Sequence, residues 1–152
     1  MLSVGTPKSP RSYRLFAQRY GWGRTLGNFL IYLPADAACD SWQQMREAVK
    51  SAYLDDLADY ADYYPDDIVQ LMARTEPFAR SESGFFLFWD TASGAGRDEF
   101  DIYATDFVGS FHLLGSDLPE MFRNLTRHGS VLQACFNRES FPNTFEGFAG
   151  MA

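Results

Sequence analysis

Residues 84–90 read Gly-Phe-Phe-Leu-Phe-Trp-Asp, and residues 100–104 read Phe-Asp-Ile-Tyr-Ala. The first run is dense in aromatic side chains and lies between a glycine and an aspartate, which predicts a strand that crosses the core. The second run alternates apolar and polar residues, so we expect the returning strand of a hairpin, with residues 91–97 as its turn. Trp89 is expected to lie in the core under a helix.

Downstream of the hairpin, the sequence predicts one strand or a pair of strands over 107–114. A helix follows over 118–125, and Ser116 or Asp117 is placed to cap its first turn. The apolar side of this helix is expected to be buried and comprises Leu118, Met121, Phe122 and Leu125. The pattern after Ser130 is ambiguous and predicts no element.

Upstream, the strongest helical pattern begins at Trp42 and continues to about Tyr64, where Pro65 ends it. Asp40 or Ser41 is expected to be its N-cap. The apolar stripe of this helix recurs at three- and four-residue spacing and comprises Trp42, Met45, Val49, Ala52 or Tyr53, Leu57 and Tyr60.

Shorter patterns flank this long helix. A helix over 12–20 is expected to stop at Gly21, because glycine suits the left-handed conformation at a helix end. Residues 29–33 form a compact apolar run that fits either a buried strand or a last helical turn, since periodicity cannot decide over so few residues. A weaker helical turn is expected over 67–72.

The order of helices, hairpin strands and a further helix predicts an α+β fold. The chain has 152 residues, which suits a single domain, and 46% of them are hydrophobic, which excludes a disordered chain. We expect a loosely ordered N-terminus over residues 1–10 and the domain over 11–152. Whether the tail after Phe141 packs on the domain is left open.

The net charge of −7 is unevenly distributed along the chain. Residues 1–24 carry five basic and no acidic side chains, whereas residues 51–73 carry six aspartates and no lysine or arginine. Because nucleic-acid affinity comes largely from cations that neutralise phosphates, we expect no nucleic-acid ligand. A basic protein is the expected partner, since opposite fields speed the encounter of two proteins.

The two cysteines, Cys39 and Cys135, have neither zinc-site spacing nor a C-x-x-C arrangement, so they suggest a reducing compartment. Basic residues interrupt the N-terminal region where a signal peptide needs an apolar core. No apolar stretch is long enough for a membrane helix. A cytoplasmic protein without a membrane partner is therefore expected.

Sequence motifs for chemistry are few. His112 and His128 lack the spacing of a metal site, and Gly94 with Gly96 lacks the third glycine of a nucleotide-binding fingerprint. The aspartates of 51–73 are spaced as on a helix face rather than around the glycine of a calcium loop. We therefore expect no enzyme, cofactor, metal or small-molecule substrate, with His112 as a catalytic base being the weakest alternative.

Several short segments resemble the SUKH superfamily, especially bacterial immunity proteins that look like the fungal cell-wall-synthesis regulator. The similarity lies in the order and spacing of glycines, aromatic strands and a following helix. The matching segments are Tyr20-Gly21-Trp22-Gly23, Phe29-Leu30, Leu33-Pro34, Pro77-Phe78-Ala79, Gly84 with Leu87-Phe88-Trp89-Asp90, Phe100-Asp101-Ile102-Tyr103 and the run from Phe111 to Phe122.

This resemblance implies a bent, mostly antiparallel sheet with helices packed around it, without an active site. The acidic helical segment at about 36–73 replaces a region that the family varies freely. Bacterial members bind and neutralise a cognate toxin, often a nuclease, so an immunity protein is the expected function. The alternative is a non-immunity SUKH domain that acts as a scaffold or regulator.

The acidic segment is the expected partner-binding surface, because tyrosines, which are enriched at binding hot spots, interleave with its carboxylates. A merely solvated acidic face is the competing interpretation. Asp90, just beyond the first hairpin strand, is expected on the rim of a concave sheet face. The candidate binding residues are Asp55, Asp56, Asp59, Tyr60, Asp62, Tyr63, Tyr64, Asp66, Asp67 and Asp90.

Overall fold

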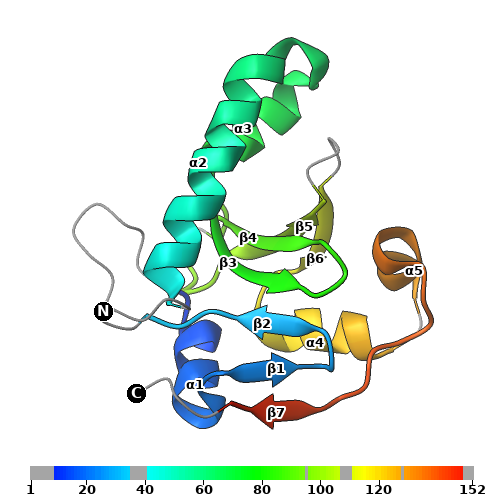
Figure 1. Ribbon diagram of the computed structural model, residues 1–152. Coiled ribbons are helices and arrows are strands. Elements are labelled where there is room, and N and C mark those ends of the chain that lie inside the picture. The colour runs from blue at the N-terminus through cyan, green and yellow to red at the C-terminus, as the bar shows by residue number, and fades with distance from the viewer. Residues whose placement is uncertain (1–8, 35–40, 95, 107–110, 128, 149–152) are drawn as a thin grey trace.

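The computed structural model describes residues 9–34, 41–94, 96–106, 111–127 and 129–148 (Figure 1). The helices in these ranges are α1 (Arg11–Tyr20), α2 (Trp42–Tyr60), α3 (Asp66–Arg74), α4 (Leu118–Thr126) and α5 (Ser130–Phe136), with a 3-10 turn η1 (Ala61–Tyr63) after α2. The strands are β1 (Gly23–Thr25), β2 (Phe29–Ile31), β3 (Thr75–Ser81), β4 (Phe86–Asp90), β5 (Asp101–Thr105), β6 (His112–Gly115) and β7 (Phe145–Gly147). The expected α+β class is confirmed.

The strands form one sheet in the order β6-β5-β4-β3-β2-β1-β7, and every pairing in it is antiparallel. From β1 to β6, each strand pairs with the next one along the chain. β7 then returns to the free edge of β1, where Arg24 lies opposite Glu146. The sheet is curved and open, as Figure 1 shows, and it organises a single domain.

Helices cover both faces of strand β4, which lies beside the central strand β3. Because consecutive side chains of a strand point to opposite faces, Phe88 and Trp89 enter different layers of the core. Phe88 stacks on Tyr53 of α2 at a ring-centroid distance of 5.3 Å. Trp89 stands edge-on against Tyr13 of α1 at 5.0 Å, and its exposed fraction is 2%. The expectation that Trp89 lies in the core under a helix is confirmed.

The layer that contains α1 also contains α4 and α5. Asp117 caps α4 by accepting a hydrogen bond from the amide of Glu120 at 2.8 Å. The side chains of Leu118, Met121 and Leu125 are buried, and Phe122 is half-buried against Phe16 of α1. The expected helix over 118–125 is therefore confirmed, together with one of its two candidate caps.

The described part of the tail after Phe141, as far as residue 148, packs on the domain. Phe141 is buried against Phe29, with ring centroids 5.1 Å apart, and the segment then continues into the edge strand β7. Residues 130–136, for which the sequence predicts no element, form α5. Phe136 of this helix contacts Phe29 and Phe85 at ring-centroid distances of 5.6 and 4.8 Å.

Three expectations are resolved by the backbone. Residues 29–31 form a strand rather than a helical turn, because they pair with both β1 and β3. The weak helical turn expected over 67–72 is the longer helix α3. The long helix predicted to reach Tyr64 ends as an α-helix at Tyr60 and continues as η1.

Some expectations lie outside the described residues. These are the loose N-terminus as far as residue 8, the cap candidate Asp40, Cys39, His128 and the first part of the strand expected over 107–114. Within the described part of the N-terminus, Pro10 is buried and its carbonyl accepts a hydrogen bond from the amide of Arg14 at the start of α1.

Candidate protein-binding surface

The first half of α2 is anchored to β3. Ser41 accepts a hydrogen bond from the amide of Gln44 at 3.2 Å, as expected of an N-cap. The indole of Trp42 donates to the carbonyl of Pro77 at 3.0 Å, and the hydroxyl of Tyr53 is hydrogen-bonded to Thr75 at 2.7 Å. Both Trp42 and Tyr53 are buried. These contacts fix the direction in which the helix leaves the sheet.

A buried carboxylate strengthens this anchor. Glu76 of β3 has a side chain that is 8% exposed, and it accepts two hydrogen bonds from the guanidinium of Arg46, at 2.6 and 3.0 Å. Lys50 adds a third bond at 3.0 Å. Since a buried charge must be paired to be tolerated, α2 carries the two cations that allow Glu76 to lie beneath it.

Beyond Tyr53, α2 extends away from the sheet and turns back through η1 into α3 (Figure 1). We call residues 54–67, at the end of this helical hairpin, the acidic arm. The hydroxyl of Tyr64 donates a hydrogen bond to Asp56 at 2.8 Å, which ties the residue after η1 to α2. This bond to a carboxylate raises the pKa of Tyr64 above its ordinary value.

The sequence-predicted residues of the arm differ in accessibility. Asp56 and Tyr64 are half-buried and bound to each other. Tyr60 and Tyr63 are 52% and 83% exposed, and their rings lie 6.2 Å apart. Leu54, which the sequence interpretation did not select, is 46% exposed on the same arm. The exposed carboxylates are Asp55, Asp59, Asp62, Asp66 and Asp67.

The arm is therefore acidic and partly apolar at once. Lysine and arginine are absent from residues 51–73, so no cation within that segment neutralises its carboxylates. A surface on which tyrosine rings stand among unneutralised carboxylates offers both long-range attraction and a local contact for a basic partner.

Asp90 does not belong to this surface. The sequence interpretation places it just beyond the strand on an exposed rim, whereas the structure makes it the last residue of β4 with an exposed fraction of 5%. Its carboxylate accepts two hydrogen bonds from the guanidinium of Arg74, at 2.7 and 3.1 Å, and one from the amide of Ala92. Asp90 thus joins α3 to the sheet, and the expectation that it lies on an exposed rim is wrong. Its role in partner binding stays a prediction.

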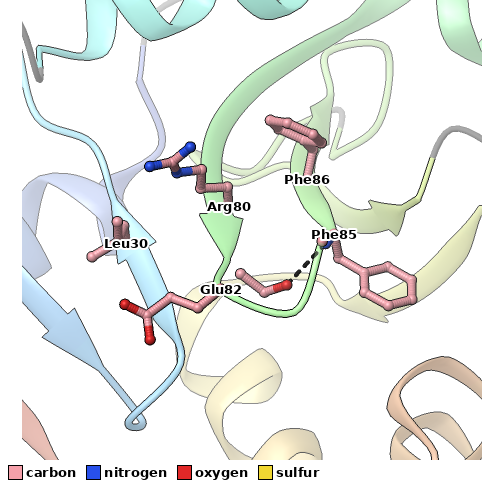
Figure 2. Close-up of a pocket in the computed structure, with 7 residues that line it drawn as sticks. Leu30, Arg80, Glu82, Phe85 and Phe86 are labelled. Carbon is pink, nitrogen blue, oxygen red and sulfur yellow. Dashed lines mark hydrogen bonds between the residues drawn. The ribbon is translucent and has the colours of Figure 1, made fainter.

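Two surface hollows are lined by residues that the structure describes. One, of about 450 Å³, lies at the turn between β3 and β4 and is shown in Figure 2; its lining is Leu30, Arg80, Ser81, Glu82, Gly84, Phe85 and Phe86. The other, of about 330 Å³, lies between α1 and α4. The first hollow is lined mainly by residues of the segment 80–86, whereas the lining of the second comes from segments that are distant in the sequence and that only the fold brings together.

The histidine, glycine and acidic residues that the sequence offers as alternative chemical sites form no such site among the described residues. His112 lies half-buried on the edge strand β6, opposite Ala104. Gly94 adopts a positive φ of 73° in the turn after β4. Throughout the described ranges, no three histidine, cysteine or acidic side chains gather as a set that holds a metal.

Burial raises the pKa of the Cys135 thiol to about 12, which keeps this side chain protonated at neutral pH. Among the residues that the structure describes, no helix is both long and apolar enough to cross a bilayer.

No protein-family description, characterised protein or solved structure matches this chain.

Proposed function

We propose that this chain is an immunity protein that binds a basic toxin, of the nuclease class, one to one through the acidic arm. The observation that carries the proposal is the exposure of Tyr60 and Tyr63 among carboxylates that no cation of the same segment neutralises. The SUKH resemblance of the strands and of α4 supports an immunity role over other kinds of protein binding. The proposed encounter takes place in the cytoplasm.

Inhibition in this proposal needs no catalysis and no cofactor. A nuclease holds its substrate with lysine and arginine side chains that neutralise phosphates. The exposed aspartates of the arm offer the same cations a carboxylate partner, while the two tyrosine rings supply rigid contact area. The arm would thus occupy the electrostatic place of the nucleic acid. The anchored base of α2 holds this surface in a fixed orientation on the sheet.

The first test is a pull-down with the tagged chain against the product of the adjacent gene, followed by isothermal titration calorimetry. We expect one-to-one binding with a Kd on the order of nanomolar, together with loss of that product's toxicity. Absence of a tight partner would contradict the immunity function, and the non-immunity scaffold would then be the better explanation of the fold.

The second test reverses the charge of the arm with the double substitution Asp59→Lys/Asp62→Lys. We expect the association rate with the captured toxin to fall about tenfold or more at low salt, because the attracting field is weakened. The rate for the unmodified chain is expected to fall steeply with added salt, and the rate for the variant is expected to depend on salt only weakly.

The matched control is Glu47→Lys/Glu139→Lys, which makes the same change in net charge at exposed positions away from the arm. This control is expected to retain most of the association rate. Equal slowing by both variants would mean that only net charge matters and that the arm is a solvated face. Tyr60→Ala/Tyr63→Ala is expected to act instead on dissociation, since the rings contribute contact rather than field.

A further inference from the structure

The hollow between α1 and α4 is aromatic at its floor. Phe16 of α1 lies there, with its ring centroid 5.9 Å from that of Phe122 and 5.2 Å from that of Tyr20. The ring of Phe145, from β7, lies 6.1 Å from Phe16 and 5.2 Å from Tyr20. Leu15 and Tyr20 remain 47% and 46% exposed at the rim. We call this surface the α1–α4 groove; its lining is Arg11, Ser12, Leu15, Phe16, Arg19, Tyr20, Glu99, Asp117, Leu118, Pro119 and Phe122.

The lining of the groove carries two arginines and two carboxylates, and the arginines are the charged groups whose hydrogen-bonding atoms stay available to a partner. Arg11 and Arg19 lie one turn before and one turn after Leu15, both are exposed, and neither forms an ion pair with any described residue. The two acidic side chains of the lining are already engaged. Glu99 accepts hydrogen bonds from the amide and the hydroxyl of Ser12, and Asp117 caps α4.

The groove and the acidic arm are therefore complementary. The groove presents two guanidinium groups without an ion-pair partner among the described residues, one of which, that of Arg19, lies over the ring of Tyr20 at 5.5 Å. The arm presents exposed carboxylates around Tyr60 and Tyr63. A volume of about 330 Å³ has room for one inserted aromatic side chain, and Tyr63, at 83% exposure, is the most accessible one on the arm. We propose that the α1–α4 groove binds the acidic arm of a second copy of this chain.

The placement of the two surfaces decides the kind of assembly. Figure 1 shows the arm at the top of the molecule and α1 with α4 at the bottom. The contact joins two different surfaces and is therefore heterologous, and copies added through it in the same orientation extend head to tail. Self-association covers the arm that the proposed toxin needs, and a toxin of higher affinity displaces the second copy. In this respect the inference rests on the proposed function.

Sedimentation velocity of the full chain tests the contact. At about 10–500 µM chain and low salt, we expect the weight-average mass to rise with concentration past that of a dimer, as a weak contact of this size does. The rise should vanish when salt is raised to about 500 mM, because the charges that attract the two copies are then screened.

Two variants isolate the two halves of the contact. The arm variant, Asp59→Lys/Asp62→Lys, retains a working groove, and the groove variant, Arg11→Gln/Arg19→Gln, retains a working arm. Each alone is expected to stay monomeric. Their equimolar mixture is expected to form a one-to-one heterodimer that cannot grow, because only one complementary pair of surfaces remains. Circular dichroism of each variant confirms that it is folded.

The outcomes separate this inference from the proposed function. A chain that stays monomeric at all concentrations, or a mixture that forms no heterodimer, overturns the head-to-tail contact and leaves toxin binding untouched. Loss of self-association in the control Arg80→Gln/Arg138→Gln, with the groove variant still associating, also overturns it. The groove variant is expected to bind the captured toxin as tightly as the unmodified chain does.

Discussion

At the scale of single residues, the two carboxylates of the described chain with the lowest exposure serve the fold. Glu76 holds α2 through Arg46 and Lys50, and Asp90 holds α3 through Arg74. From the sequence, Asp90 is expected on a binding rim, because a polar residue directly after an aromatic strand usually begins a surface loop. Its burial depends on Arg74, which lies on a different element, and no local pattern around residue 90 reveals that partner.

The Arg74–Asp90 pair predicts an asymmetry in stability. The side chain of Asp90 is 7% exposed and that of Arg74 is 41% exposed. Arg74→Met leaves a buried carboxylate without its main partner and is expected to lower the free energy of unfolding by about 3 kcal/mol. Asp90→Asn leaves a cation that reaches water, with an expected loss of about 1 kcal/mol.

Urea unfolding of both single variants and of the double variant measures this asymmetry. The double variant is expected to be more stable than Arg74→Met alone, since the unpaired carboxylate is gone. If Asp90→Asn instead left stability unchanged and weakened binding of the captured toxin, Asp90 would be a binding residue after all.

Two buried tyrosines predict sensitivity to alkali. Tyr13 donates a hydrogen bond to the carbonyl of Tyr32 at 2.6 Å, and the hydroxyl of Tyr53 is hydrogen-bonded to that of Thr75. Burial raises the pKa of both hydroxyls above their ordinary value of 10.0. Above that pH the unfolded chain loses these protons while the folded chain keeps them, so stability falls as pH rises. Below it, their contribution is fully present.

We expect the free energy of unfolding to fall by up to about 1.4 kcal/mol per pH unit for each tyrosine above pH 10. Urea unfolding between about pH 8 and pH 12 checks the slope. In the variant Tyr13→Phe/Tyr53→Phe, the free energy of unfolding should fall less steeply with pH, because the two tyrosine hydroxyls no longer contribute. An equal slope in the variant would show that other groups cause the alkaline loss.

At the scale of elements, the sequence predicts best where one face of a helix or one apolar run determines the structure. The stripe of α2 and the hairpin of β4 and β5 are of this kind. The central strand β3 was missed because Thr75, Glu76 and Pro77 do not alternate and proline disfavours a central strand. The structure places Pro77 beside an irregularity in the register with β4, which is where a sheet tolerates it.

The three-residue strands β1 and β7 are too short to give a periodic signal. They also depend on each other. A methyl group at Gly23 would come within 2.2 Å of the carbonyl oxygen of Glu146, so the close approach of the two strands requires glycine there. That requirement is set by a residue near the other end of the sequence.

The two halves of α2 are expected to differ in local stability. Residues 42–53 are held by buried contacts with β3, whereas residues 54–60 lie beyond the sheet, with Tyr64 as a hydrogen-bonded partner of Asp56. Segments with few buried contacts open more readily. Hydrogen–deuterium exchange is expected to be about tenfold or more faster in residues 54–60 than in 42–53.

Tyr64→Phe provides the matched perturbation of the arm, because it removes the bond to Asp56 and changes little else. We expect it to speed exchange over residues 54–67 and to leave 42–53 unaffected. Uniform protection along the whole of α2 would mean that the arm is held as firmly as the base, contrary to this expectation.

At the scale of the whole molecule, charge is sorted into two regions that the sequence only partly indicated. The concentration of aspartates in 51–73 is visible in the sequence, and the structure places it on a helical hairpin away from the sheet. The basic N-terminal residues are also visible, but their pairing with the aromatic side chains of α4 and β7 is not. Only the fold brings Arg19, Phe122 and Phe145 to one surface.

The last strand of the sheet pairs with the first, and this order has a consequence for synthesis on the ribosome. β1 to β6 can pair as they emerge, each with its predecessor, but the outer edge of β1 waits for residues 145–147. At roughly 5–20 residues per second, that wait is on the order of ten seconds. During this interval the nascent domain exposes an unpaired strand edge beside Phe16 and Tyr20. Chaperone binding to the nascent chain is therefore expected mainly in this interval, before β7 pairs with β1.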